Sequence, residues 1–337
     1  MVNTQDLLAS LLSNGVSCEL AELVRYRALA RKLNLVPNGS IKSSMAGTIT
    51  SRFKGRGMEF DEARHYQPGD DIRSIDWRVT ARTGKTHTKL YREERERPVL
   101  IFIDLSSSMQ FGTSLLYKSV QALHAAALVT FSALSRGDKI GCMAVSNNID
   151  IERKPKSTAK QALSMLNQLI ELQNNAIIET YTNAKQPALQ KTASPRETAD
   201  QSTTHMNQLA MLARPGTLVY VISDFINVSN SAFSVLGKIK RHCEVRPLRI
   251  FDPIEEALPA VNSMQDVLLS NGLQEQHILL GDSSINEQYK RIRGDVFDAL
   301  KANLNSLGLP LRQISAAQPI EQQLSASKSG LILGEFR

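Results

Sequence analysis

The sequence predicts an α/β protein built on a doubly wound, mostly parallel β-sheet, with an N-terminal helical and turn- and β-rich module in front of it. Residues 99–103 are apolar at every position, which is typical of a strand buried on both faces of a sheet. After residue 98, such runs alternate with longer helical segments, which indicates βαβ units. The 337 residues, 42% hydrophobic and 22% charged, are enough for one full α/β domain and a smaller one.

The α/β domain is expected to occupy residues 99–337. Its strands are predicted at 99–103, 139–145, 217–223, 244–250 and 311–315, with a hairpin partner at 149–154. Its helices are predicted at 115–135, 159–172, 205–213, 232–241 and 286–307. Residues 173–204 are rich in Gln, Asn, Thr and Ser. They are expected to form a polar insertion, which at this length is functional or partly disordered.

Two smaller regions precede this domain. Residues 1–39 are predicted to form a helical hairpin, broken at Asn14-Gly15. Residues 40–98 are expected to form an Arg-, Asp- and Gly-rich turn and β module. Because arginines alternate there with acidic residues, we expect internal ion pairs, with a docking surface as the alternative. The same acidic residues disfavour a nucleic-acid patch, although the net charge is +7.

Other classes of protein are disfavoured by the sequence. The three cysteines are far apart, so neither a disulfide framework nor a zinc site is indicated. The chain contains neither the phosphate-binding loop of ATPases nor the GxSxG elbow of serine hydrolases. It shows no signal peptide and no transmembrane segment, so we expect a soluble, cytoplasmic protein. His124 lies in an apolar helix and is predicted to be a core residue rather than a ligand.

Oxygen-bearing side chains follow the first buried strand. Asp104, Ser106 and Ser108 alternate directly after it, and Asp224 stands where a later apolar run stops. Open α/β sheets bind ligands beyond the carboxyl ends of their strands. Carboxylates and hydroxyls are hard donors, so these residues are predicted to bind Mg²⁺, with Mn²⁺ or Ca²⁺ as alternatives. Another interpretation is that they only cap the next helix and bind no ion.

Residues 104–109 resemble the metal-ion-dependent adhesion site of von Willebrand factor A-type domains. Asp104, Ser106 and Ser108 match the first loop of that site, and Asp224 fits its third loop. The resemblance implies a threonine ligand from a second loop. We assign this role to Thr204, with Thr203 as the alternative.

Four further stretches resemble the domain-of-unknown-function family numbered fifty-eight. They lie at 55–60, 66–77, 81–85 and 252–259. Members of that family carry such a block directly before a von Willebrand A-type domain. The resemblance implies an accessory role beside a MoxR-type AAA+ ATPase, in chaperone-like assembly or maturation of other proteins.

The expected function is therefore divalent-cation-dependent protein binding, in which an acidic residue of the partner completes the coordination of the ion. We do not expect an enzyme. The alternative is a metal-dependent phosphoester hydrolase, because the same oxygens could hold Mg²⁺ against a phosphate. That reaction would require Asp104 to be both ligand and nucleophile, and no lysine for the phosphate is evident downstream in the sequence.

Overall fold

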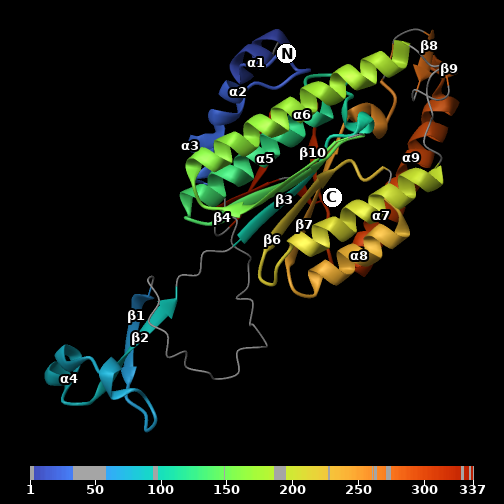
Figure 1. Cartoon of the computed structure of the whole chain (residues 1–337). Coiled ribbons are helices and arrows are strands. Elements are labelled where there is room, and N and C mark those ends of the chain that lie inside the picture. The colour runs from blue at the N-terminus through green and yellow to red at the C-terminus, as the bar shows by residue number, and fades with distance from the viewer. Residues whose placement is uncertain are drawn as a thin grey trace. The chain divides into compact units, whose positions relative to one another are not determined.

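The computed structural model of the chain describes most residues after position 57. The described residues are 4–32, 58–93, 98–147, 149–185, 195–226, 228–259, 261, 264–270, 275–327, 330–333 and 335–336. The chain divides into two compact units (Figure 1). One consists of Met1–Val36 together with Arg97–Arg337, and the other of Pro37–Glu96. The larger unit contains the α/β sheet.

A seven-stranded sheet forms the centre of the larger unit, in the order β13-β10-β7-β6-β3-β4-β5. Neighbouring parallel strands make up its middle: β10 (Arg312–Ser315), β7 (Glu244–Phe251), β6 (Leu218–Ser223), β3 (Pro98–Asp104) and β4 (Lys139–Val145). Antiparallel strands close the two edges: β5 (Asp150–Lys156) and β13 (Glu335–Phe336). The predicted α/β class with a mostly parallel sheet is confirmed.

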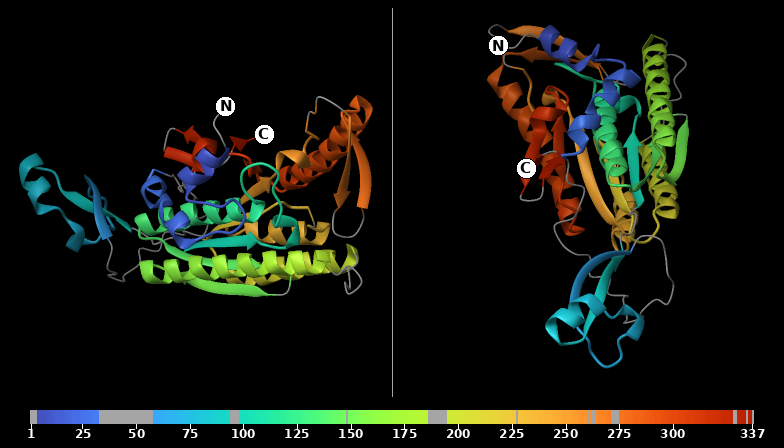
Figure 2. Two further views of the ribbon diagram at one scale, coloured as in Figure 1. Left: turned by 90° about the horizontal axis from the view of Figure 1, so that it is seen from above. Right: turned by 90° about the vertical axis from the view of Figure 1, so that its left-hand side faces the viewer.

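Helices cover both faces of this sheet (Figures 1 and 2). The first face carries α5 (Lys118–Ser135) and α6 (Ala159–Lys185). The second face carries α7 (Pro195–Leu212), α8 (Asn230–Lys240) and α9 (Ser283–Ser306). The sheet is therefore doubly wound, as predicted.

The central strand β3 shows why both faces are covered. Ile101 and Ile103 enter the core on the side of α5 and α6, whereas Leu100 and Phe102 enter the core on the side of α7 and α8. Successive residues of a strand point to opposite faces, so a strand that is apolar at every position is stable only between two helical layers. The sequence of β3 thus dictates its central place.

Helix α5 is the buried helix of this unit. Leu123, Val129 and most of its other residues are buried, so the longest apolar stretch of the sequence belongs to the core. His124 is fully buried, as predicted for a core residue. Within the described stretches, no helix combines the length and the hydrophobicity that a membrane span requires.

Most of the segment 173–204, which was predicted to be a polar insertion in the form of a loop, is helical in the structure. Helix α6 continues to Lys185, α7 begins at Pro195, and only residues 186–194 lie outside the described part of the chain. The buried side chain of Gln173 gives the reason. Its amide donates to the backbone oxygen of Val16 over 2.8 Å and accepts from the backbone nitrogen of Cys18 over 3.3 Å. Because these hydrogen bonds satisfy its amide, the polar side chain of Gln173 can be buried and continue the buried face of α6.

The N-terminal residues form short helices rather than a separate hairpin domain. These are α1 (Thr4–Leu11), α2 (Leu20–Val24) and α3 (Tyr26–Ala30). Leu11, Leu23 and Ala30 are buried in the same core cluster as α5 and α6. The expected boundary after residue 39 is therefore corrected, because these helices are too short to be stable alone and belong to the α/β unit.

A buried hydrogen-bonded chain connects the N-terminal helices to α5. Nε2 of His124 lies 2.6 Å from Oε1 of Glu22, and Nδ1 lies 3.0 Å from the hydroxyl of Tyr26. Each of the three residues is at most 1% exposed. The Glu22 carboxylate accepts from Nε2, so Nδ1 of a neutral imidazole accepts from Tyr26. These bonds fix α2 and α3 against α5.

The smaller unit is a hairpin with two short helices. β1 (Met58–His65) pairs antiparallel with β2 (His87–Glu93), and η1 (Ile72–Ser74) and α4 (Trp77–Thr83) lie between them in sequence. Arg64 forms an ion pair with Asp70 over 2.7 Å, as predicted for this module. Residues 55–57, which carry part of the family resemblance, lie outside the described residues.

Two hairpins that the sequence analysis did not predict complete the larger unit. β8 (Gln265–Ser270) pairs with β9 (Glu275–Leu280), and β11 (Leu324–Ser327) pairs with β12 (Gly330–Leu333). Among the described residues of this unit, the sequence also did not predict the 3₁₀ helices η2 (Ser107–Met109), η4 (Pro253–Glu255) and η5 (Ile320–Gln323).

The close approach of β4 and β5 leaves no space for a side chain at Gly141. A Cβ at Gly141 would lie 2.4 Å from the backbone oxygen of Arg153, at a register shift of the β4–β5 ladder. We expect Gly141→Ala to lower the free energy of unfolding by about 1–3 kcal/mol in urea titrations, because backbone must move. Gly294→Ala is the control, since a Cβ there meets nothing within 4 Å and helix propensity favours alanine. Equal stability of the Gly141→Ala variant and the wild type would contradict this account.

Candidate metal centre at the carboxyl edge of the sheet

The candidate site lies where the order of the strands reverses. From β3 the chain proceeds to β4 on one side, and it later returns to β6 on the other side of β3. Such a reversal leaves a crevice beyond the carboxyl ends of the two strands, where open α/β sheets bind their ligands. Asp104 is the last residue of β3, and Ser223 is the last residue of β6.

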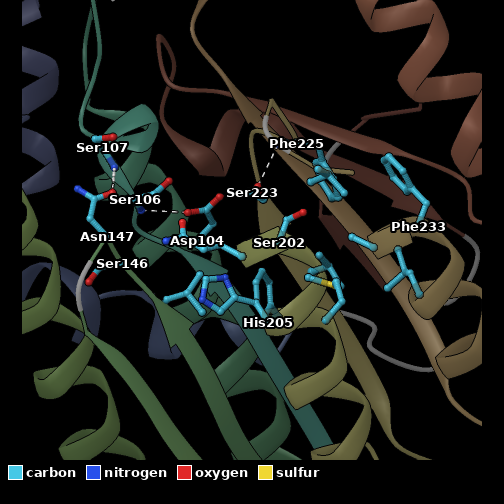
Figure 3. A pocket seen from close by; sticks show the side chains of 18 residues that line it. Asp104, Ser106, Ser107, Ser146, Asn147, Ser202, His205, Ser223, Phe225 and Phe233 are labelled. Atoms are coloured by element: carbon cyan, nitrogen blue, oxygen red, sulfur yellow. Dashed lines mark hydrogen bonds between the residues drawn. The ribbon is translucent and has the colours of Figure 1, made fainter. Parts of the chain in front are cut away.

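The carboxylate of Asp104 is held in place from both sides. The backbone nitrogen of Ser106 donates to its Oδ1 over 2.9 Å, and the hydroxyl of Ser223 donates to its Oδ2 over 2.9 Å. The turn after β3 is fixed in its own right, because the backbone nitrogen of Ser107 donates to Oδ1 of Asn147 over 3.0 Å (Figure 3). The carboxylate is thus oriented before any ligand arrives.

The hydroxyl groups beside Asp104 fit the coordination shell of a small hard cation. Oγ of Ser106 and Oγ of Ser108 lie 3.3 Å apart. In an octahedron with metal–oxygen distances of about 2.0–2.1 Å, neighbouring ligand oxygens are about 3 Å apart. The two hydroxyls and the nearby carboxylate therefore suit Mg²⁺ in both spacing and donor type.

Asp224 lies near Asp104, but a lysine occupies one of its oxygens. Nζ of Lys118 is 2.9 Å from Oδ2 of Asp224 and 2.5 Å from Oε1 of Glu255, and the Lys118 side chain is 1% exposed. Oδ1 of Asp224 accepts from the backbone nitrogen of Ile226 over 3.1 Å. Asp224 is therefore a buried ion-pair partner of Lys118 in this structure.

Burial and neighbouring charges shift the pKa values of Asp104 and Lys118. Burial raises the pKa of Asp104, the charge of Asp224 raises it further, and hydrogen bonds from Ser106 and Ser223 oppose the rise. Burial lowers the pKa of Lys118, but Asp224 and Glu255 outweigh it, so that pKa is raised. Among the described residues, Asp104 has no ion-pair partner of its own. An added cation would therefore stabilise its ionised form.

The structure places Thr204 within helix α7 rather than on a loop. Thr204 is exposed on α7, and Thr203 bonds to Ser229 and Ser231 over 2.9 and 2.7 Å. The predicted second loop is part of a helix, and α7 presents Ser202 and His205 to the crevice instead. The assignment required a loop that the helical sequence does not form.

A cavity of about 140 Å³ opens beside Asp104, between β3, β6, α7 and α8 (Figure 3). One side of the cavity is lined by Asp104, Ser106 and Asn147. His205 also lines it, with its Nε2 3.4 Å from Oδ2 of Asp150. Apolar side chains form the rest of the wall, among them Phe225 and Phe233. Ser108 and Asp224 do not line this cavity, so it adjoins the candidate metal centre without coinciding with it.

A second group of metal-binding side chain types occurs under the N-terminal helices. One ligand atom each of Cys18, Glu22 and His124 lies within 4.8 Å of the others, and all three residues are buried. The sequence does not predict this group, because the three positions are far apart in the chain. Both ring nitrogens of His124 are engaged by Glu22 and Tyr26, so we interpret the group as a hydrogen-bonded network.

Several residues that shape the metal centre were not predicted from the sequence. Ser223 precedes the predicted Asp224 and could have been found as a hydroxyl at a strand end. Lys118 is a charged residue at the start of an apolar helix, which is a signal for a buried ion pair. Glu255 lies within the stretch 252–259 that carried the family resemblance.

Proteins of known sequence and structure resemble the chain as follows. An uncharacterised protein of Mycobacterium bovis and one of Mycobacterium tuberculosis are each 28% identical to it over 247 residues, which cover 73% of this chain and 71% of theirs. A crystal structure of the conserved hypothetical protein BatB from Bacteroides thetaiotaomicron matches with a TM-score of 0.33 and 13% identity, over 63% of this chain and 98% of that one. An aerotolerance-related membrane protein from Bacteroides fragilis matches with a TM-score of 0.34 and 17% identity, over the same shares.

A family assignment comes from the sequence pattern described as "Protein of unknown function DUF58". This pattern matches residues 62–293, which include the second half of β1 and all of β2, the strand ends with Asp104 and Asp224, and the η4 motif with Glu255. The match covers more than half of the chain. The chain therefore belongs to the DUF58 family.

Proposed function

We propose that this protein is a divalent-cation-dependent protein-binding module of the von Willebrand A type. The Mg²⁺ ion would be held by Asp104, Ser106 and Ser108. It would act as a Lewis acid and coordinate a carboxylate of the partner protein. The observation that carries the proposal is the pair of hydroxyls 3.3 Å apart beside a pre-oriented carboxylate. Asp224 would favour the cation through its charge, and Thr203 and Thr204 are left out of the ligand set.

A binding role fits the surroundings of Asp104 better than phosphoester hydrolysis does. Hydrolysis would need a cationic group that faces the phosphate. Lys118 is close to Asp224, but it is buried and bonded to two carboxylates, so it does not offer its charge to a substrate. His205 is paired with Asp150 rather than with a nucleophile. We therefore propose that the chain is not an enzyme.

The proposed partner is a MoxR-type AAA+ ATPase, with a role in assembly or maturation of other proteins. Membership of the DUF58 family supports this partner class, through the resemblance described above. The test is the affinity of the purified chain for the MoxR-type ATPase of the same organism, measured by biolayer interferometry in Mg²⁺ and in EDTA. Equal affinity in both conditions would count against an ion-mediated contact.

Cation binding is tested by thermal unfolding. At about a hundred times its Kd, Mg²⁺ should add about 2.7 kcal/mol to the free energy of unfolding and raise Tm by several degrees. We expect Asp104→Ala and Ser108→Ala to lose this shift, because each removes a ligand. Mn²⁺ and Ca²⁺ titrations identify the preferred ion.

The matched control is Ser107→Ala. Ser107 lies between the two proposed hydroxyl ligands, is exposed, and contributes a backbone bond that the substitution keeps. It should retain the full Mg²⁺ shift. A wild-type protein without any cation-induced shift, or a shift that persists in Ser108→Ala and Asp104→Ala, would remove the metal hypothesis.

A further inference from the structure

We propose that the cavity beside Asp104 binds a bulky apolar side chain of the same partner segment whose carboxylate meets the cation. This inference rests on the proposed function, because it takes the cation site as given and asks what the adjoining space recognises. The expected ligand is a peptide segment with an aspartate or glutamate. A few residues from that acidic residue, the segment carries an apolar side chain of the size of leucine, methionine or phenylalanine.

The walls of the cavity select an apolar group. Phe102 and Val221 come from β3 and β6, Met206 from α7, and Phe233 and Leu236 from α8. Each of these side chains is at most 8% exposed. Apolar walls do not stabilise an ion or a carboxylate. An apolar side chain that enters the cavity leaves water, which favours the bound state.

The size of the cavity limits the occupant to one side chain. Its volume is about 140 Å³. An apolar cavity of roughly 150 Å³ accepts a benzene molecule. One leucine-, methionine- or phenylalanine-sized group therefore fits, and the side chain of glycine or alanine leaves most of the space empty.

The mouth of the cavity connects this group to the cation site. Asp104 and Ser106 line the cavity and also belong to the proposed metal centre. Asn147, Ser202 and His205 add polar groups to the lining of the cavity. One short segment of a partner can thus reach the ion and the apolar wall together, which defines a two-part recognition motif.

A peptide selection on the full chain tests the proposal. The probe is a displayed library of short random peptides, each with one fixed glutamate, selected in the presence of Mg²⁺. We expect Mg²⁺-dependent binders that share Leu, Met or Phe at a constant distance from the glutamate. Replacing that side chain with alanine should weaken binding about tenfold to a hundredfold, as expected for the loss of one buried apolar group.

A variant of the cavity separates this effect from cation binding. Val228 is half-buried and lines the cavity, so Val228→Phe should fill part of it. The variant should bind the selected peptides as weakly as the wild type binds their alanine forms, with an unchanged Mg²⁺ shift in Tm. Val296→Phe is the control, since Val296 is 55% exposed on α9 and does not line the cavity.

The outcomes distinguish the two proposals. Mg²⁺-dependent peptides that share no apolar residue would overturn the cavity proposal and leave the cation site standing. Full affinity of Val228→Phe for the selected peptides would do the same. If no peptide binds in a Mg²⁺-dependent way, the cavity proposal falls, and the Mg²⁺ titration shows whether the cation site falls with it.

Discussion

Lys118→Met is expected to lower the free energy of unfolding by about 3–5 kcal/mol, because it leaves buried carboxylates without their cation. Lys118 is 1% exposed and lies between Asp224 and Glu255, at 2.9 and 2.5 Å. Methionine keeps the length and the apolar stem of the side chain, so the loss reports the charge. Urea titration at neutral pH measures it.

Two controls make this result specific. Lys160→Met removes an exposed lysine from α6 and should change stability by less than about 0.5 kcal/mol. Glu255→Gln combined with Lys118→Met should cost less than the sum of the single variants, because the two groups interact directly. Additive losses in that double variant would contradict a shared ion pair.

Glu22→Ala is expected to lower the free energy of unfolding by about 1–3 kcal/mol, because it leaves the buried N–H of His124 without an acceptor. The change removes the acceptor that lies 2.6 Å from Nε2 of His124 and leaves that nitrogen buried. The N-terminal helices should also detach more readily from α5. Urea unfolding gives the loss of stability, and limited proteolysis detects release of the first thirty or so residues.

The control for this variant is Glu171→Ala, at an exposed position of α6. Glu22→Gln is informative beside it, because it keeps a hydrogen-bond acceptor but removes the charge. It should lie between Glu22→Ala and the wild type. Wild-type stability of Glu22→Ala would show that the chain of Glu22, His124 and Tyr26 does not anchor the N-terminus.

The sequence predicted the sheet well because each central strand is encoded locally. The apolar run of β3 and the alternation that follows it depend on residues a few positions apart, and these patterns do not change when the chain folds. Asp104, Ser106 and Ser108 were predictable for the same reason, since they follow one another at a strand end. Helix ends were less predictable, because the burial of Gln173 depends on Val16 and Cys18 at the far end of the sequence.

The remainder of the site could not be predicted because its partners are distant in sequence. Lys118 meets Asp224 and Glu255 across 106 and 137 positions, and Ser223 meets Asp104 across 119. No local pattern encodes such pairs. Thr204 illustrates the opposite error, since a family resemblance assigned it to a loop although its neighbours form the helix α7.

The antiparallel edge strand β5 has a consequence for the behaviour of the protein in concentrated solution. An open sheet edge presents unpaired backbone groups on which strands of other molecules can assemble. β5 carries Glu152, Arg153, Lys154 and Lys156 in a largely exposed strand, and Pro155 removes one backbone donor. Charge repulsion and a missing donor both oppose the addition of another strand. The β5 edge thus disfavours the addition of a strand from another molecule.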